Sequence, residues 1–164
     1  MVTVEEITNF KQTLREQGPK TFTSLLSAII IWLFSVLVFI PIASSIGKNV
    51  ELVIVLITLS AFSAIILVSL RGVNNLLDVF SVIPARKYFV KKGLSVESAI
   101  SVSKLFLYVP SILFVYLLYF PYLALLHPAI NGIVLIFVII SLFLISLNIV
   151  SISKKVITDW LYST

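Results

Sequence analysis

Polar side chains at helical spacing are the residues of this sequence that could do chemistry, because most of the chain is apolar. One set, Arg71, Asn74, Asn75 and Asp78, falls at i, i+3, i+4 and i+7 and so shares one face of a helix. Arg71 and Asp78 are too far apart on a straight helix to pair directly, so Asn74 is expected to bridge them. This interfacial stripe predicts either a substrate or partner contact or a solvated face just outside a membrane.

A second polar stripe lies in more apolar sequence, where polar groups are costly and therefore point to packing or to function. Its members recur at nearly helical spacing and are Lys104, Tyr108, Ser111, Tyr119 and Tyr122. They predict either the wall of a cavity or tyrosines at the two membrane interfaces with one packed hydroxyl between them.

A third stripe comprises Ser141, Asn148, Ser151 and Lys155. Asn148 is its most informative member, because it lies within an expected hydrocarbon region and should hydrogen-bond across to another helix. The small residues that would permit such an approach lie earlier in the chain and are Ser60, Ala61, Ser63 and Ala64. The interpretation favoured for Asn148 is therefore structural.

Catalytic constellations are missing from the sequence. It holds no Cys and a single His, His127, so we expect no metal centre, no cofactor and no thiol chemistry. Paired carboxylates, a Ser/His/Asp set and a P-loop are also missing. His127 precedes Pro128 and is most simply a turn residue. The sequence thus predicts a protein that is not an enzyme.

The composition identifies the environment of the chain. Of its 164 residues, 60% are hydrophobic and 12% are charged, whereas soluble domains have roughly 45–50% apolar and about 25% charged residues. We expect an all-α integral membrane protein, with residues 1–164 forming one transmembrane helical domain. The net charge is +5, and the basic residues flank the apolar segments. Contact with the lipid bilayer therefore explains this charge better than binding to nucleic acid.

Four apolar segments are long enough to cross a hydrocarbon core of about 30 Å. The predicted spans are about 22–46, 50–70, 99–126 and 130–153. The helix of the second span is expected to continue toward Pro84, and the third to be kinked at Pro110 and Pro121.

Two shorter helices are predicted outside the spans. Residues 1–21 read as an amphipathic interfacial helix that ends at Gly18-Pro19. A short cytoplasmic helix is expected over residues 85–92, opened by Pro84 and closed by Gly93. Its candidate partner-binding residues are Arg86, Lys87, Tyr88, Lys91 and Lys92. Ser95 is expected to cap the next helix.

The distribution of basic residues predicts the orientation in the membrane. Of the 12 Lys and Arg residues, only Lys48 lies in the two short loops on one side, and the other eleven lie on the opposite side. Short loops rich in Lys and Arg stay inside, so both termini are expected in the cytoplasm and the protein in the cell membrane.

An internal repeat would relate the two halves of the chain. A shift of 80 residues superposes Leu33, Phe34, Leu37 and Pro41 on Leu113, Phe114, Leu117 and Pro121. Apolar composition alone explains such identities equally well. The matched prolines favour a tandem duplication of two hairpins of the same orientation.

Apolar spans without catalytic groups predict a scaffold or anchoring subunit of a larger complex, with other membrane subunits or further copies as partners. The alternative rests on layout, which is similar in outline to the first four spans of ABC-2-type export permeases, although those usually have six. That resemblance implies that Arg86, Lys87 and Tyr88 meet a cytoplasmic ATPase. An oligomeric channel lined by the second stripe is a third hypothesis. The Ile/Ser/Lys-rich, Cys-free composition suits a thermophilic archaeon or its virus.

Overall fold

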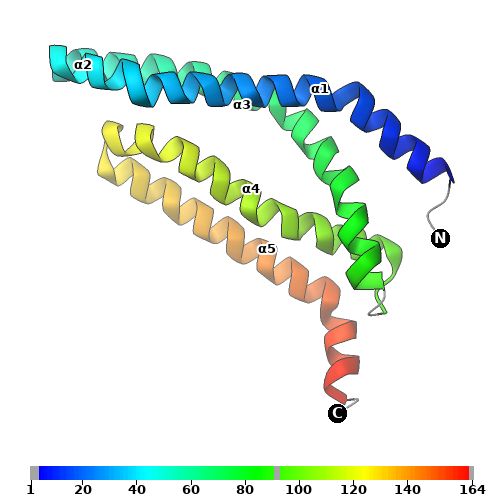
Figure 1. Cartoon of the computed structure of the whole chain (residues 1–164). Coiled ribbons are helices and arrows are strands. Elements are labelled where there is room, and N and C mark those ends of the chain that lie inside the picture. The colour runs from blue at the N-terminus through cyan, green and yellow to red at the C-terminus, as the bar shows by residue number, and fades with distance from the viewer. Residues whose placement is uncertain (1–3, 91–92, 163–164) are drawn as a thin grey trace. The chain divides into compact units, whose positions relative to one another are not determined.

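The computed structural model describes the backbone of residues 4–90 and 93–162, and most side chains between residues 12 and 154 (Figure 1). Almost all of the described chain is helical, and no strand occurs in it. The elements in chain order are α1 (Val4–Phe34), the π-helix η1 (Ser35–Phe39), α2 (Ile40–Ile46), α3 (Lys48–Pro84), the π-helix η2 (Ala85–Phe89), α4 (Val96–Leu126) and α5 (Pro128–Tyr162).

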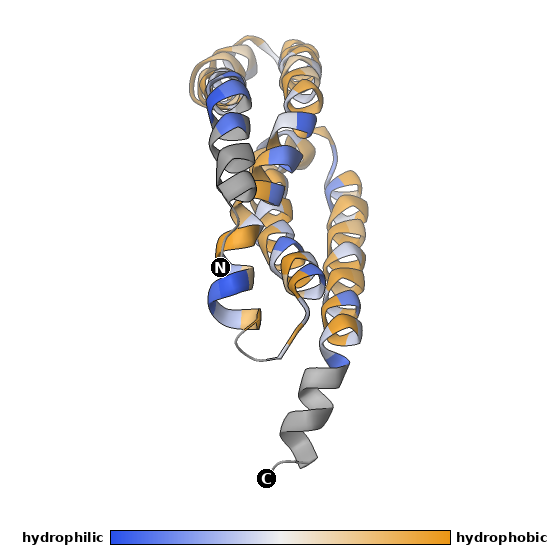
Figure 2. Ribbon diagram, turned by 90° about the vertical axis from the view of Figure 1, so that its right-hand side faces the viewer, coloured by the Kyte–Doolittle hydropathy of each residue, from blue (hydrophilic) through white to orange (hydrophobic). Residues whose placement is uncertain are grey.

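Four candidate membrane spans are found among the described residues, as the sequence predicted. They are Gly18–Ile46, Lys48–Phe89, Val96–Leu126 and Pro128–Lys154. Apolar residues dominate all four helices (Figure 2). By length and composition, the chain is therefore a multi-pass membrane protein.

The predicted helix end at Gly18-Pro19 is wrong, because α1 continues through both residues. Pro19 removes one main-chain hydrogen bond, but Gly18 carries no Cβ to crowd the proline ring. The Thr23 hydroxyl also donates to the Pro19 carbonyl at 2.8 Å. The side chains of the predicted amphipathic face, Val4, Ile7, Phe10 and Leu14, lie outside the described residues.

Pro41 is accommodated by a π-turn that the sequence analysis did not predict. In η1 the Ile40 N–H donates to the carbonyl of Ser35, five residues earlier. A proline ring collides with the carbonyl four residues before it, and a widened turn relieves that contact. The helix then resumes as α2 up to Gly47, where the chain reverses into α3.

Pro84 does not open a separate helix, so that prediction is also wrong. Instead α3 runs to Pro84, as expected, and continues directly into η2. A turn follows at Gly93, where φ is +93° and the N–H donates to the Val90 carbonyl at 3.1 Å. Ser95 then caps α4, because its Oγ accepts the Ser98 N–H at 3.3 Å. The predicted cap at Ser95 is confirmed, whereas the helix end predicted at Gly93 stays a prediction, because residues 91 and 92 lie outside the described residues.

The second hairpin turns at His127, as expected. The Nδ1 of His127 accepts the Ala129 N–H at 3.1 Å, which caps the start of α5. Tyr116 donates to the Asn131 amide oxygen across this turn at 3.2 Å. α4 runs as a regular α-helix through Pro110 and Pro121, and kinks at those prolines stay a prediction.

The chain divides into two compact units. The first unit contains Met1–Leu76 and Tyr116–Val134, and the second contains Leu77–Val115 and Leu135–Thr164. The hydrophobic core cluster belongs to the first unit. Its buried members are Ala28, Ile40, Val55, Phe62 and Tyr122.

Candidate functional site

An aromatic cluster forms the centre of the first unit. Phe62 of α3 is completely buried, and its ring centroid lies 5.0 Å from that of Tyr119 in an edge-on arrangement. Tyr122 is also completely buried, and its ring centroid lies 6.0 Å from that of Phe62. Both tyrosines belong to the end of α4. Two members of the second predicted stripe therefore face the protein interior.

Two hydrogen bonds join α4 to the first hairpin within this unit. Tyr119 donates to the Ser63 hydroxyl of α3 at 3.0 Å. The Trp32 indole N–H of α1 donates to the carbonyl of Leu118 at 2.7 Å. The sequence analysis did not single out Trp32. It could have been found from the sequence, because an indole N–H in the middle of an apolar span needs an acceptor from another helix.

Three hydroxyls meet beside the aromatic cluster, on Ser35, Thr58 and Tyr122. Ser35 is the first residue of η1 and is completely buried. Tyr122 lies near the other two hydroxyls, yet neither its Oη nor Ser35 Oγ has a hydrogen-bond partner among the described residues. Thr58 donates back to the Ile54 carbonyl at 2.8 Å. We refer to these three hydroxyls as the hydroxyl cluster.

Replacing Tyr122 with phenylalanine tests whether the hydroxyl cluster has an occupant. A buried hydroxyl without a partner contributes nothing to stability, so Tyr122→Phe should leave the free energy of unfolding unchanged or raise it by about 1 kcal/mol. The matched variant Tyr119→Phe loses a bond between helices and should cost about 0.6 kcal/mol. Unfolding by SDS in mixed micelles measures both. A greater loss for Tyr122→Phe would mean that its hydroxyl binds a water or ligand.

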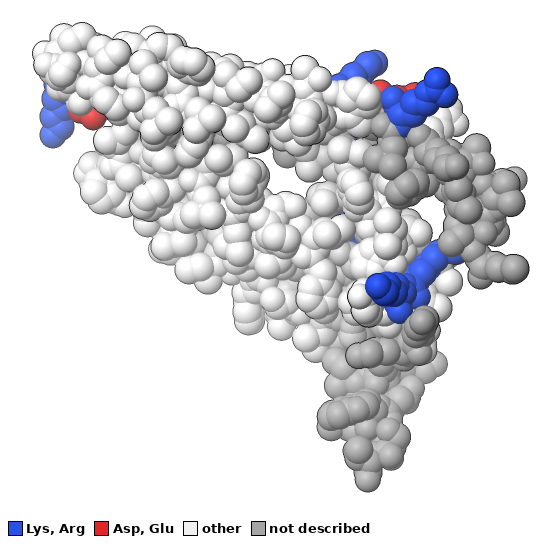
Figure 3. Space-filling view, in the orientation of Figure 1, with Lys and Arg blue, Asp and Glu red and all other residues white. Residues whose placement is uncertain are grey.

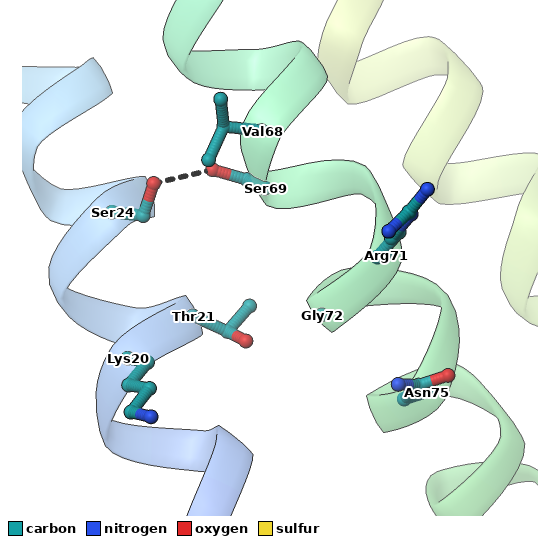
Figure 4. Close-up of a pocket in the computed structure, with 8 residues that line it drawn as sticks. All are labelled: Lys20, Thr21, Ser24, Val68, Ser69, Arg71, Gly72 and Asn75. Atoms are coloured by element: carbon teal, nitrogen blue, oxygen red, sulfur yellow. Dashed lines mark hydrogen bonds between the residues drawn. The ribbon is translucent and has the colours of Figure 1, made fainter.

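A pocket of about 370 Å³ opens between α1 and α3 in the first unit. Residues from both helices line it, namely Lys20, Thr21, Ser24, Val68, Ser69, Arg71, Gly72 and Asn75 (Figure 4). At its closed side the hydroxyls of Ser24 and Ser69 lie 2.6 Å apart. Thr21 is only 5% exposed and faces Gly72.

The interfacial stripe of α3 is thus only partly brought to this pocket. Arg71 and Asn75 line it, whereas Asn74 is exposed and does not. The sequence analysis missed Lys20, Thr21 and Ser24 as parts of a site. No periodic signal marks them, because they are contributed by a helix that packs across α3 far away in sequence.

Asp78 belongs to the second unit and forms an ion pair with Lys104 of α4, with 2.5 Å between Oδ1 and Nζ. The sequence analysis had expected Asn74 to bridge Asp78 to Arg71 and did not predict the pair with Lys104. The Lys104 ammonium also lies 5.7 Å from the centroid of the Tyr108 ring. Because the two charged side chains are 25% and 51% exposed, solvent weakens their attraction. This pair orients α3 and α4 within the second unit more than it stabilises them.

The basic turn η2 presents part of the predicted partner-binding set. Lys87 and Tyr88 are exposed, with the ammonium 5.3 Å from the ring centroid, and Arg86 is half-buried. Phe89 stacks on Phe106 of α4 at 5.9 Å, which fixes the turn against the helix. Lys91 and Lys92 lie outside the described residues.

Hydroxyls elsewhere in the predicted stripes bond within their own helices. Ser111 donates to the Leu107 carbonyl, and Ser141 donates to that of Phe137, both at 2.8 Å. Asn148 and Ser151 are exposed on α5. The Asn148 amide has no hydrogen bond to any described residue, so its predicted bond to another helix of this chain is not formed there.

Most of the face shown in Figure 3 is white, and the blue and red of charged side chains cover only small parts of it. Among the described residues, no three His, Cys, Asp or Glu side chains are grouped so as to hold a metal ion.

By the length and composition of its four helices, the chain belongs to the class of multi-pass helical membrane proteins. No protein-family model, curated protein or solved structure matches it.

Proposed function

We propose that this chain is a non-enzymatic membrane protein that acts as a scaffold or anchoring subunit of a larger complex in the cell membrane. The observation that carries the proposal is the surface of α5. The most apolar part of its span, within Pro128–Lys154, has no residue buried within the chain. Asn148 is exposed on the same helix. An amide facing hydrocarbon is costly. We therefore expect α5 to pack against a helix of another membrane subunit or of a second copy.

The orientation with both termini in the cytoplasm is part of this proposal. Its support is the charge distribution, in which Lys48 alone lies on the opposite side.

We also propose that the two hairpins arose by tandem duplication. The residues at their turns, Gly47 and His127, are separated by 80 positions, which is the shift that superposes Pro41 on Pro121.

Transport is the second candidate function, with coupling to a cytoplasmic ATPase through residues 84–92. The exposed Lys87 and Tyr88 favour it. Two observations favour the scaffold instead. Residues 85–89 continue α3 rather than forming a separate cytoplasmic helix, and Tyr122, which an oligomeric channel would need beside its path, is completely buried.

Substitution of Asn148 tests the proposal. Interhelical polar bonds contribute about 0.6 kcal/mol on average and up to about 1.7, so Asn148→Leu should weaken association about 3- to 20-fold. Native mass determination in mild detergent over a range of protein concentrations measures this. We expect the unchanged chain to exceed the mass of a monomer and Asn148→Leu to shift toward the monomer mass.

Ser146→Leu is the matched control, since Ser146 is exposed on another side of α5 and donates to the Leu142 carbonyl of its own helix. It should associate like the unchanged protein. A stable lone monomer of the unchanged chain, in membranes of its host as well as in detergent, would contradict the proposed function.

A further inference from the structure

We propose that the pocket between α1 and α3 binds the phosphate group of an anionic ligand, either a phospholipid headgroup or a free phosphate compound. The pocket is not required by the scaffold function. Its position, charge and unused hydrogen-bonding groups each support the inference, and all of its lining belongs to the first unit.

The pocket lies where both helices change from apolar to polar sequence. The apolar run of α1 begins at Phe22, and that of α3 ends at Leu70. Six of the eight lining residues are polar, while Val68 of the lining is 79% exposed and Phe22, which follows Thr21 in α1, is 68% exposed. A molecule bound there would place a polar group in the pocket and an apolar part along the helices, which is the arrangement of a phospholipid.

The charged side chains of the lining are both cations. Lys20 and Arg71 are exposed, neither has an ion-pair partner among the described residues, and no carboxylate is among the described lining residues. Figure 4 shows Lys20 beside Thr21, whereas the guanidinium of Arg71 extends from α3 away from α1. Lys20 therefore supplies the charge already at the pocket. Arg71 lines the pocket with an exposed side chain, so we expect its guanidinium to turn toward a bound phosphate and to offer it paired donors.

Hydrogen-bond accounting identifies the hydroxyl that remains to donate. Ser69 donates its single hydrogen to the Ile65 carbonyl at 2.7 Å, so Ser24 must be the donor in the bond that joins it to Ser69. Both serine hydrogens are thus used. Thr21 is 95% buried, its hydroxyl has no hydrogen-bond partner among the described residues, and it points from α1 toward α3 (Figure 4). A phosphate oxygen would accept this hydrogen together with one from Lys20.

Native mass spectrometry of the full chain in a mild nonionic detergent tests the site. Phosphatidic acid is the probe, and phosphatidylcholine, whose choline cancels the phosphate charge, is the comparison. We expect one phosphatidic acid per chain to be retained in preference to phosphatidylcholine. One cation near a membrane surface contributes about fivefold to such binding, so Lys20→Gln and Arg71→Gln should each weaken it about fivefold. Thr21→Val keeps the side-chain shape and should also weaken it.

Lys48→Gln is the matched control, because it removes the same charge from an exposed position at the other end of α3. Lys48→Gln should leave binding within about twofold of the unchanged chain, since salt screens a charge that lies more than a Debye length from the pocket. Equal weakening by Lys48→Gln and Lys20→Gln, or equal retention of the two lipids, would overturn the proposal.

Excess inorganic phosphate distinguishes the two sources of the phosphate group. If it fails to displace phosphatidic acid, the ligand is a lipid. If it displaces the lipid in the unchanged chain but not in Lys20→Gln, the pocket serves a free phosphate compound. A lipid headgroup is the expected outcome because Val68 of the lining and Phe22, which follows Thr21 in α1, are exposed apolar side chains.

Discussion

Phe62→Ala is expected to lower the free energy of unfolding by about 3 kcal/mol, which is the low end of the range for truncating a buried aromatic residue. Phe62 has no exposed surface and contacts the rings of both Tyr119 and Tyr122. The low end applies because the unfolded reference state in a membrane also surrounds the side chain with apolar material. The loss then comes from the unfilled cavity and the missing dispersion contacts.

The neighbours of Phe62 are poorly placed to fill that cavity. Tyr119 is fixed by its hydrogen bond to Ser63, and the backbone of α4 is fixed one residue earlier by the bond from Trp32 to Leu118. Rings attached to α4 can therefore collapse into the space only if these two bonds are stretched. For this reason the effect should exceed that of any single hydroxyl removal in the same unit.

Unfolding by SDS in mixed micelles measures the change, with Phe143→Ala as the control. Phe143 lies in the span of α5 and is 61% exposed, so its truncation leaves no cavity in the chain and should cost less than about 0.5 kcal/mol. If both variants lose the same stability, Phe62 is not the centre of a packed core and the arrangement of α3 against α4 is different from that described.

Sequence patterns predicted the four apolar helices and the turns at Gly93, Ser95 and His127, because these depend on local chemistry. Hydropathy and length define a span, and the cap and turn residues act on backbone within a few positions. Prolines were less predictable. Pro19 and Pro84 lie inside helices, since the consequence of a proline depends on whether the preceding turn can widen or find another donor.

Contacts between helices could not be predicted, because apolar spans carry little directional signal. Such a helix is hydrophobic on all sides, so its pattern does not show which face meets a neighbour. The bonds from Tyr119 to Ser63 and from Lys104 to Asp78 join residues 56 and 26 positions apart. Both pairs included residues that the stripes had marked as polar. The stripes thus located the participants, and only the structure supplied their partners.

The crossing of α1 and α3 gives the second large expected effect, for Gly72→Ala. A Cβ at position 72 would lie 2.1 Å from Thr21 Oγ1 and 3.1 Å from both Thr21 Cβ and Cγ2. Rotating the threonine moves Oγ1 and Cγ2, but the contact with its Cβ at 3.1 Å stays because that atom is fixed to the backbone of α1. The two helices must therefore move apart, at a cost of about 1–3 kcal/mol. The same displacement should break the bond between Ser24 and Ser69.

Two further variants make this expectation specific to the crossing. Gly132→Ala adds the same methyl group to α5, where nothing lies within 4 Å of the new Cβ, so it should be neutral or slightly stabilising in SDS unfolding. Combining Gly72→Ala with Thr21→Gly removes the three nearest atoms that the new Cβ would meet. The double variant should therefore be more stable than the sum of the two single losses predicts. Strict additivity would mean that α1 and α3 do not approach each other at these residues, and it would remove the closed side of the pocket as well.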